Sequence, residues 1–178
     1  MTGSATSGGM PPTANSERSA PTDGEGLRVI LEDLLREAET DAGGRMMASI
    51  LLLDETGEHL LHGAAPSLPA AYNEAIHGIA IGPGVGSCGT AAYLGHPVYV
   101  TDIPTDPLWK NFKGLAAEHG LRACWSTPIE GDDGAILGTF AVYHRAPRTP
   151  TSEELAAITL VSKAAAAAIL KERAKRRN

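Results

Sequence analysis

The sequence predicts an α+β fold in which helices cover both faces of an antiparallel β-sheet. Apolar residues recur at helical spacing near both ends of the chain, which indicates a first and a last amphipathic helix. Between them, two pairs of strand-like apolar runs are each joined by a short turn that contains Asp and Gly, as is typical of β-hairpins. Short helical segments separate these pairs without the regular strand–helix alternation of a parallel sheet, so we expect antiparallel pairing.

Composition divides the 178-residue chain into a tail, one domain and a short basic end. Residues 1–24 are mostly Gly, Ser, Thr and Pro, with too few apolar side chains to offset the entropy of ordering them, so we predict a disordered tail. Residues 25–174 are long enough to form one domain with a single core. Residues 175–178 are predicted to be a basic tail.

Three elements are expected in the first part of the domain. Residues 25–44 form an amphipathic helix that ends at a Gly-Gly pair. Residues 45–65 form the first hairpin, with an Asp-Glu-Thr-Gly turn between its strands. Residues 66–78 form a short helix closed by a glycine.

The middle of the domain is expected to contain two helices with one strand between them. Residues 89–94 look like a short helix, and residues 97–103 look like a strand. A further helix is predicted from Asp106, the expected N-cap, to Gly120, with Pro107 at the first helical position. Its apolar residues recur at helical spacing throughout.

A second hairpin and a long helix complete the domain. The runs "LRACWSTPI" and "AILGTFAVYH" flank the turn "EGDDG" and are predicted strands. The last helix begins after Thr151, which has a capping-box spacing to Glu154. This helix carries an apolar stripe with an alanine run, which permits close packing: Leu155, Ile158, Val161, Ser162, Ala165 and Ile169.

Charge and composition exclude several classes of function. The net charge of −6 argues against a dedicated nucleic-acid binder, and aromatics at 4% are too few for a base-stacking surface. No apolar run approaches the roughly 20 residues that span a bilayer, and no secretion signal precedes the domain. Two cysteines do not make a disulfide framework and fit a reducing compartment. We therefore expect a cytoplasmic protein without a nucleic-acid or membrane partner.

The segment "GPGVGSCGTAAYLG" at residues 82–95 concentrates backbone freedom, because it holds five glycines around one cysteine, Cys88. A helix that starts at Cys88 or Gly89 would direct the free amides of Ser87, Cys88, Gly89 and Thr90 toward a pocket. Such a helix start suits a small anion or a carboxylate. A tight turn whose buried amides are satisfied within the protein is the alternative.

From about Leu27 to Lys171 the chain resembles the GAF domain family of small-molecule sensors. The resemblance rests on the order and spacing of "ASILLLDETGEHL", "GPGVGSCGTAAYLGHPVYVTDI", "GLRACWSTPI" and "GAILGTFAVYH". It is strongest to the GAF domains of bacterial sensor kinases and cyclic-di-GMP enzymes, and stand-alone nitrate-receptor proteins and free methionine-(R)-sulfoxide reductases are also similar. The resemblance implies a six-stranded antiparallel sheet with the N- and C-terminal helices on one face. It implies a ligand pocket on the other face, under the short helices.

Strand alternation, matched to the methionine sulfoxide reductases, predicts which side chains face that pocket. Cys88 would lie at the rim, facing Cys124, and Trp109 would lie on the helix over the pocket, whereas Trp125 would face the terminal helices. An ordinary half-polar core layer is the alternative for the strand residues. The predicted pocket residues on the strands are Ser49, Cys124, Ser126, Thr139, Ala141 and Tyr143.

The same resemblance argues against catalysis. Positions at which the reductases bind substrate through acidic residues carry Cys124, Ala141 and Tyr143 here, and no thiol stands at their catalytic cysteine position. We expect no cofactor and no metal ligand set, and His119 is the best of the histidines for a pocket role. A reductase-like enzyme that uses Cys88 as its thiolate and a Cys88–Cys124 redox switch remain as alternatives, as do two inert buried thiols.

The sequence therefore predicts a non-catalytic GAF sensor of bacterial signal transduction. It would bind a small polar or anionic molecule under residues 82–95 and report occupancy through its first and last helices. Those helices are expected to form a homodimer, against the alternative that the apolar stripe packs only on its own sheet. The output is expected to lie with a downstream signalling protein. A dimerisation module with a vestigial pocket is the further alternative.

Overall fold

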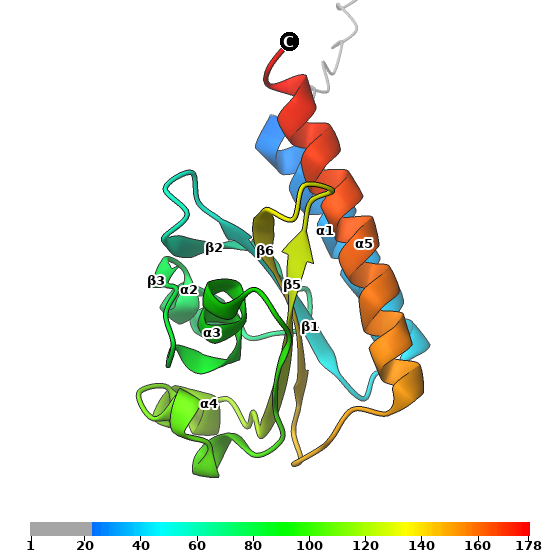
Figure 1. The fold of residues 1–178 in the computed structure, drawn as a ribbon. Coiled ribbons are helices and arrows are strands. Elements are labelled where there is room, and N and C mark those ends of the chain that lie inside the picture. The colour runs from blue at the N-terminus through cyan, green and yellow to red at the C-terminus, as the bar shows by residue number, and fades with distance from the viewer. Residues whose placement is uncertain (1–22) are drawn as a thin grey trace, which may run out of the picture.

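The computed structural model describes residues 23–178, and residues 1–22 of the predicted tail lie outside the described residues. The centre of the fold is a six-stranded antiparallel sheet with the order β3-β2-β1-β6-β5-β4 (Figure 1). The predicted fold class is therefore confirmed. The strands are β1 (Met47–Leu53), β2 (His59–Ala64), β3 (Ile79–Ala80), β4 (Val98–Val100), β5 (Ala123–Glu130) and β6 (Ile136–His144).

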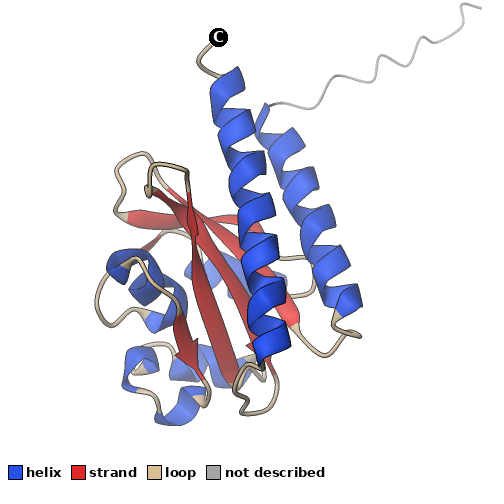
Figure 2. Cartoon of the chain, turned by 45° about the vertical axis from the view of Figure 1, so that its right-hand side comes forward, coloured by secondary structure: helices blue, strands red, loops and turns tan. Residues whose placement is uncertain are grey.

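Helices form one layer on each face of this sheet (Figures 1 and 2). The long helices α1 (Asp23–Asp41) and α5 (Ser152–Lys175) lie side by side on one face. The short helices α2 (Ala70–Ile76), α3 (Gly86–Leu94) and α4 (Lys113–Glu118) cover the other face. Each face has its own apolar core, with Trp125 and Phe140 under the long helices and Tyr72 and Tyr143 under the short ones.

The ends of the two long helices fall close to the predicted positions. The first helix begins at Asp23, inside the predicted tail, and is followed by Gly43 and Gly44, both with a φ of 69°. The last helix begins with the predicted capping box, in which Thr151 accepts a hydrogen bond from the Glu154 amide. It runs to Lys175, the first residue of the predicted basic tail.

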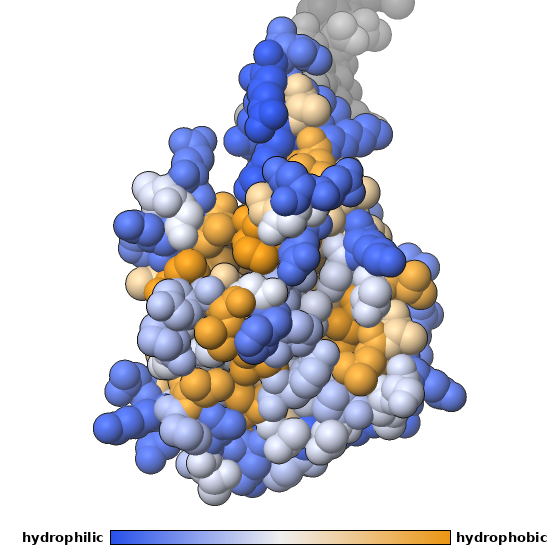
Figure 3. Space-filling view, viewed as in Figure 1, coloured by the Kyte–Doolittle hydropathy of each residue, from blue (hydrophilic) through white to orange (hydrophobic). Residues whose placement is uncertain are grey.

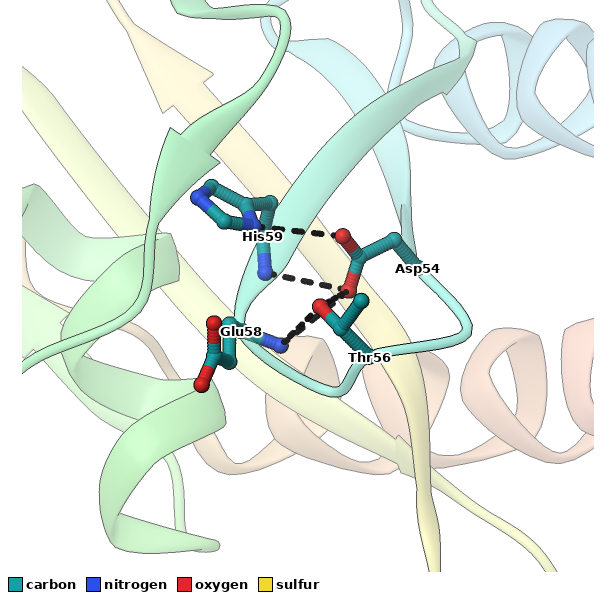
Figure 4. A network of polar contacts seen from close by, with 4 residues as sticks. All are labelled: Asp54, Thr56, Glu58 and His59. Atoms are coloured by element: carbon teal, nitrogen blue, oxygen red, sulfur yellow. Dashed lines mark hydrogen bonds and ion pairs between the residues drawn. The ribbon is translucent and has the colours of Figure 1, made fainter.

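The turn between β1 and β2 is held by one carboxylate (Figure 4). Asp54 Oδ1 accepts hydrogen bonds from the Thr56 hydroxyl and from the amides of Glu58 and His59, and Asp54 Oδ2 lies 3.2 Å from His59 Nδ1. Desolvation raises the pKa of Asp54, but these donors outweigh it and lower the pKa to about 2. The predicted hairpin turn is therefore held by the ionised carboxylate of Asp54.

The predicted continuous helix from Asp106 to Gly120 is wrong. Asp106 does cap the start, since it accepts from the Leu108 amide, but only the 3-10 turn Pro107–Trp109 follows directly. The backbone leaves helical geometry at Phe112, with a φ of −124°, before α4 begins. The Trp109 indole donates a hydrogen bond to Ser87 on α3, and this tertiary contact overrides the local helical pattern.

The apolar stripe of the last helix is buried within the chain. Ile158, Ser162, Ala165 and Ile169 are buried, and the apolar residues among them belong to the core beneath the long helices. These four residues therefore pack within the chain, whereas Leu155 and Val161 of the same stripe are half-buried. Among residues 23–178, no helix combines the length and the apolar character that crossing a bilayer requires.

Candidate ligand-binding site

The glycines at the start of α3 shape the wall of the candidate site. Gly86 opens the helix with a φ of 57°, in the left-handed region that glycine adopts at little cost. At Gly89 a Cβ would stand 2.7 Å from the Val85 Cβ, so a side chain there has no room. Of the glycines around Cys88, Gly86 is therefore required by the backbone path and Gly89 by close packing.

The helix begins earlier than the sequence predicts, at Gly86 rather than at Cys88 or Gly89. In a helix with this start, the Gly89 and Thr90 amides are used in the first intrahelical hydrogen bonds, so neither is free for a ligand. The Thr90 hydroxyl accepts from the Val85 amide and donates to the Gly86 carbonyl. Only Ser87 and Cys88 of the predicted amide set lie in the unpaired first turn.

Ser87 joins three parts of the site. Its hydroxyl donates to the Cys124 carbonyl on β5 at 2.9 Å and accepts from the Trp109 indole Nε1 at 3.0 Å. All three residues are buried. This hydrogen-bonded chain fixes α3 against the sheet and holds the Trp109 ring over the start of the helix.

The sheet beneath α3 carries a row of buried hydroxyls. In the strand register Ser49 and Ser126 both lie opposite Ala141, and Thr139 lies opposite Leu51. The hydroxyls of Ser49, Ser126 and Thr139 are fully buried and have no hydrogen-bond partner among the described residues. Buried polar groups normally have a protein or water partner, so three such hydroxyls on one face of the sheet are unusual in a protein core.

The site also contains two buried free thiols, Cys88 on α3 and Cys124 on β5. The Cys124 thiol lowers the pKa of Cys88 to about 7, against the effect of burial. The hydroxyls of Ser126, Thr139 and Tyr143 act in the same direction, so those of Ser126 and Thr139 lie near the Cys88 sulfur although neither makes a hydrogen bond of normal geometry. Burial, and then the neighbouring Cys88, raise the pKa of Cys124. Of the two thiols, Cys88 is therefore the one that loses its proton more readily, beside the first turn of α3.

The open space at this site is small. The cavity has a volume of about 20 Å³, enough for one water molecule. Tyr72 and Tyr143 meet in it, with their hydroxyls 3.0 Å apart and their rings edge to face. Its walls are Leu51, Tyr72, Ile76, Ile79, Val85, Gly86, Ser87, Cys88, Trp109, Phe112 and Tyr143.

Four of the predicted site residues line this cavity, namely Ser87, Cys88, Trp109 and Tyr143. Cys124 and Ala141 lie in the same apolar core beneath it. The hydroxyls of Ser49, Ser126 and Thr139 face the same side of the sheet but do not border the open space, and neither do Gly89 and Thr90. Trp125 lies under the long helices, as predicted.

Two aromatic residues that line the cavity, Tyr72 and Phe112, are not predicted from the sequence. The signal for Tyr72 was present, because Tyr72 and Ile76 are four residues apart on one face of α2. Phe112 was hidden by the wrong helix prediction. His119 does not line the cavity and instead packs its ring on Tyr72 at 5.8 Å.

Comparison with known proteins gives one family. A family model described as "GAF domain" matches residues 24–170. The methyl sulfide methyltransferase-associated sensor of Methanosarcina acetivorans is 39% identical over 132 residues, which are 74% of this chain and 13% of that protein. The chain therefore spans only a small part of this curated relative.

Solved structures share the fold. The GAF domain of a phosphoenolpyruvate-protein phosphotransferase from Coxiella burnetii superposes with a TM-score of 0.69 at 21% identity, over 85% of this chain and 87% of that chain. A type II free methionine-R-sulfoxide reductase from Thermoplasma acidophilum superposes with a TM-score of 0.65 at 16% identity, over 84% of this chain and 96% of that chain.

Proposed function

The chain belongs to the GAF domain family, and we propose that it is a non-catalytic sensing domain that binds a small polar or anionic molecule between α3 and the sheet. The relative that matches it over most of its described length is named a sensor. The two buried free thiols suit a protein of a reducing, cytoplasmic compartment. The proposal places the output in a downstream signalling protein.

One observation carries the proposal: the unpartnered hydroxyls of Ser49, Ser126 and Thr139 beneath the start of α3. A buried hydroxyl without a partner costs about 1–3 kcal/mol, which a bound donor or acceptor recovers. The unpaired first-turn amides of Ser87 and Cys88 add partial positive charge on the same side. Together these groups favour a compact polar molecule over an apolar one.

The size of the cavity restricts how this molecule is held. A space of about 20 Å³ accepts a water-sized group, so a larger ligand needs the roof to move. The roof residues Trp109 and Phe112 lie on either side of the break between the 3-10 turn and α4. A shift of this irregular segment would admit a ligand of several atoms without unfolding the sheet.

The sheet would pass such a shift to the terminal helices. The short helix α3 packs on β5 and β6 from one face, and α5 packs on the same two strands from the other. Each terminal helix also keeps exposed apolar residues, with Val29 46%, Ile30 51% and Leu160 70% exposed. We propose that these surfaces, rather than the buried stripe, form the homodimer that transmits the signal.

A thermal-unfolding screen tests the sensing proposal. The panel holds nitrate, nitrite, sulfate, small carboxylates, cyclic nucleotides and methionine sulfoxide, and a ligand at a hundredfold its Kd raises Tm by roughly 5–10 °C. The rise is expected to disappear in Ser126→Ala and to persist in Ser162→Ala, a buried serine on the opposite face. A panel in which no compound raises Tm contradicts the proposed ligand class.

A second candidate function rests on the lowered pKa of Cys88. A Cys88 thiolate could attack the sulfur of a methionine sulfoxide and, with one proton, give the sulfenic acid and methionine. The Cys124 thiol would then displace water to form a disulfide, which an external dithiol would reduce. Turnover of free methionine-(R)-sulfoxide with dithiothreitol that Cys88→Ser abolishes would establish this reaction. Equal rates for the protein and Cys88→Ser would exclude it.

A further inference from the structure

We propose that Cys88 and Cys124 form a reversible disulfide in response to a hydroperoxide, with Cys88 as the thiol that the peroxide oxidises and Cys124 as the thiol that then closes the disulfide. This inference rests on the proposed sensing function and deepens it, because it assigns a chemical class to the signal at the same site. One peroxide is consumed for each disulfide formed, so the reaction reports exposure to the oxidant without turnover.

The two cysteines lie on segments of α3 and β5 that are joined directly. Ser87, the residue before Cys88, donates its hydroxyl to the Cys124 carbonyl at 2.9 Å. The Cys124 thiol is also the largest cause of the lowered pKa of Cys88, so the two thiols interact with each other. Both are free and belong to one buried apolar core. A bond between them would tie the first turn of α3 to β5.

The open space at the site determines which thiol meets the oxidant. Cys88 borders the cavity, whereas Cys124 lies beneath it with an exposed fraction of 0%. A cavity of about 20 Å³ holds one water-sized molecule, and hydrogen peroxide is larger than water by only one oxygen atom. A peroxide in this space therefore meets Cys88 first.

The surroundings of Cys88 favour an uncharged oxidant. Among the residues that the structure describes, no charged side chain lines the cavity. Figure 3 shows hydrophobic surface over the short helices α3 and α4, which cover this face of the sheet. The titratable side chains that face Cys88 are Cys124, Tyr72 and Tyr143. With no cation at the cavity, a neutral peroxide enters at less cost than an anionic oxidant.

The two phenols at the cavity are hydrogen-bond donors. Burial raises the pKa of Tyr72 and of Tyr143, so both keep their protons at neutral pH. Tyr72 donates to the Tyr143 oxygen at 3.0 Å. The Tyr143 proton is therefore left for the Cys88 thiolate or for an oxygen of the peroxide.

The first step is oxidation of the Cys88 thiolate. Its sulfur attacks one oxygen of hydrogen peroxide, the O–O bond breaks, and the products are the sulfenic acid and hydroxide, which takes a proton from solvent to become water. The hydroxyls of Ser126 and Thr139 stabilise the thiolate, because they help the Cys124 thiol to lower the pKa of Cys88 to about 7.

The second step closes the disulfide. The Cys124 sulfur attacks the sulfur of the sulfenic acid, an S–S bond forms and the S–O bond breaks, and the hydroxyl leaves as water with the Cys124 proton. Burial, and then the neighbouring Cys88, raise the pKa of Cys124, and oxidation of Cys88 removes the second of these causes. Cys124 therefore ionises more readily after the first step than before it. An external dithiol restores both thiols by exchange.

The test counts free thiols after treatment with hydrogen peroxide. The reduced protein is treated at pH 7, quenched with acid, unfolded and alkylated with N-ethylmaleimide for mass spectrometry. We expect loss of both alkylation sites and their return after dithiothreitol. The expected rate is about threefold that of the same protein unfolded in urea, because about half of Cys88 is ionised at pH 7 against about 3% of an ordinary thiol, while the more acidic thiol is the weaker nucleophile.

Serine variants separate the roles of the two thiols. Cys124→Ser is expected to stop at the Cys88 sulfenic acid, which dimedone traps, at a rate within about threefold of that of the unaltered protein. Cys88→Ser is expected to react at least about tenfold more slowly, since Cys124 does not border the cavity and its pKa is raised.

The dependence of the rate on pH tests the role of the buried hydroxyls. Ser126→Ala should move the midpoint of the rate-against-pH curve to higher pH, because it removes a group that lowers the pKa of Cys88. Ser162→Ala, at a buried serine on the opposite face, should leave the midpoint unchanged.

The proposal is overturned if the folded protein keeps both thiols or reacts more slowly than the unfolded chain, or if Cys88→Ser reacts like Cys124→Ser. It is also overturned if methionine sulfoxide forms the disulfide as fast as hydrogen peroxide does. A panel compound that raises Tm while peroxide leaves both thiols intact removes this inference and leaves the sensing function standing. A disulfide that forms while no panel compound raises Tm supports this inference and removes the reversible ligand.

Discussion

Replacement of Ser87 by alanine tests the hydrogen-bonded chain that holds the site under α3. The change removes the acceptor of the Trp109 indole N–H and the donor to the Cys124 carbonyl. Trp109 is 4% exposed and its indole has one donor, so water cannot replace the lost partner without a rearrangement. The Cys124 carbonyl belongs to a strand that is paired on both sides, so the loss of the Ser87 donor costs it less.

The expected loss of stability follows from these two groups. A buried polar group left without a partner costs about 1–3 kcal/mol, and with the carbonyl at the low end the sum is about 2–4 kcal/mol. For a domain of this size that loss lowers Tm by roughly 5–15 °C. Urea unfolding of the protein and of Ser87→Ala measures the difference directly.

Two further variants make the result specific. Ser162→Ala is the matched control, because Ser162 is also a buried serine in a helix but its hydroxyl has no partner among the described residues. Because a buried hydroxyl without a partner is itself costly, Ser162→Ala is expected to leave stability unchanged or to raise it. In the cycle with Trp109→Phe, the two changes should couple by about 1 kcal/mol or more. If Ser87→Ala costs no more than Ser162→Ala, Ser87 does not hold the site together.

Three other perturbations have definite outcomes. Gly138→Ala would drive its methyl into the Leu51 carbonyl of the neighbouring strand, so we expect a loss of about 3 kcal/mol or more, or failure to fold, by urea unfolding and circular dichroism. Asp54 has a lowered pKa of about 2, so its contribution to the free energy of unfolding is present above pH 4 and is lost as the pH falls toward 2. Asp54→Asn should therefore reduce the loss of stability between pH 4 and pH 2, as measured by urea unfolding. An equal loss in the protein and in Asp54→Asn would refute this. His144 has a lowered pKa, so the folded state favours the neutral ring: stability should fall as the pH drops below about 6.5, less steeply in His144→Phe than in the protein.

Much of the fold could be predicted because local patterns and tertiary packing agree. The hairpin turn at Asp54, the capping box at Thr151 and the Gly-Gly end of the first helix all depend on residues close in sequence. The segment around Phe112 could not be predicted in this way. Its helical spacing is real, but Trp109 is fixed by Ser87, 22 positions away, and that contact sets the backbone path.

The candidate site was predictable on the sheet and less so on its roof. Period-two alternation places Ser126 and Cys124 on one face regardless of the tertiary detail. The start of α3 depends on Gly86, whose positive φ does not follow from its neighbours, so the Gly89 and Thr90 amides were assigned wrongly.

The central claim is that the row of buried hydroxyls beneath α3 binds a small polar molecule. A high-resolution crystal structure of the protein as purified from its host tests this most directly. The account predicts ordered density of a small polar molecule within hydrogen-bond distance of at least two of the hydroxyls of Ser49, Ser126 and Thr139, and loss of that density in Thr139→Val. Hydroxyls that bond only to protein atoms, with α3 packed directly on the sheet and no density between them, would contradict it.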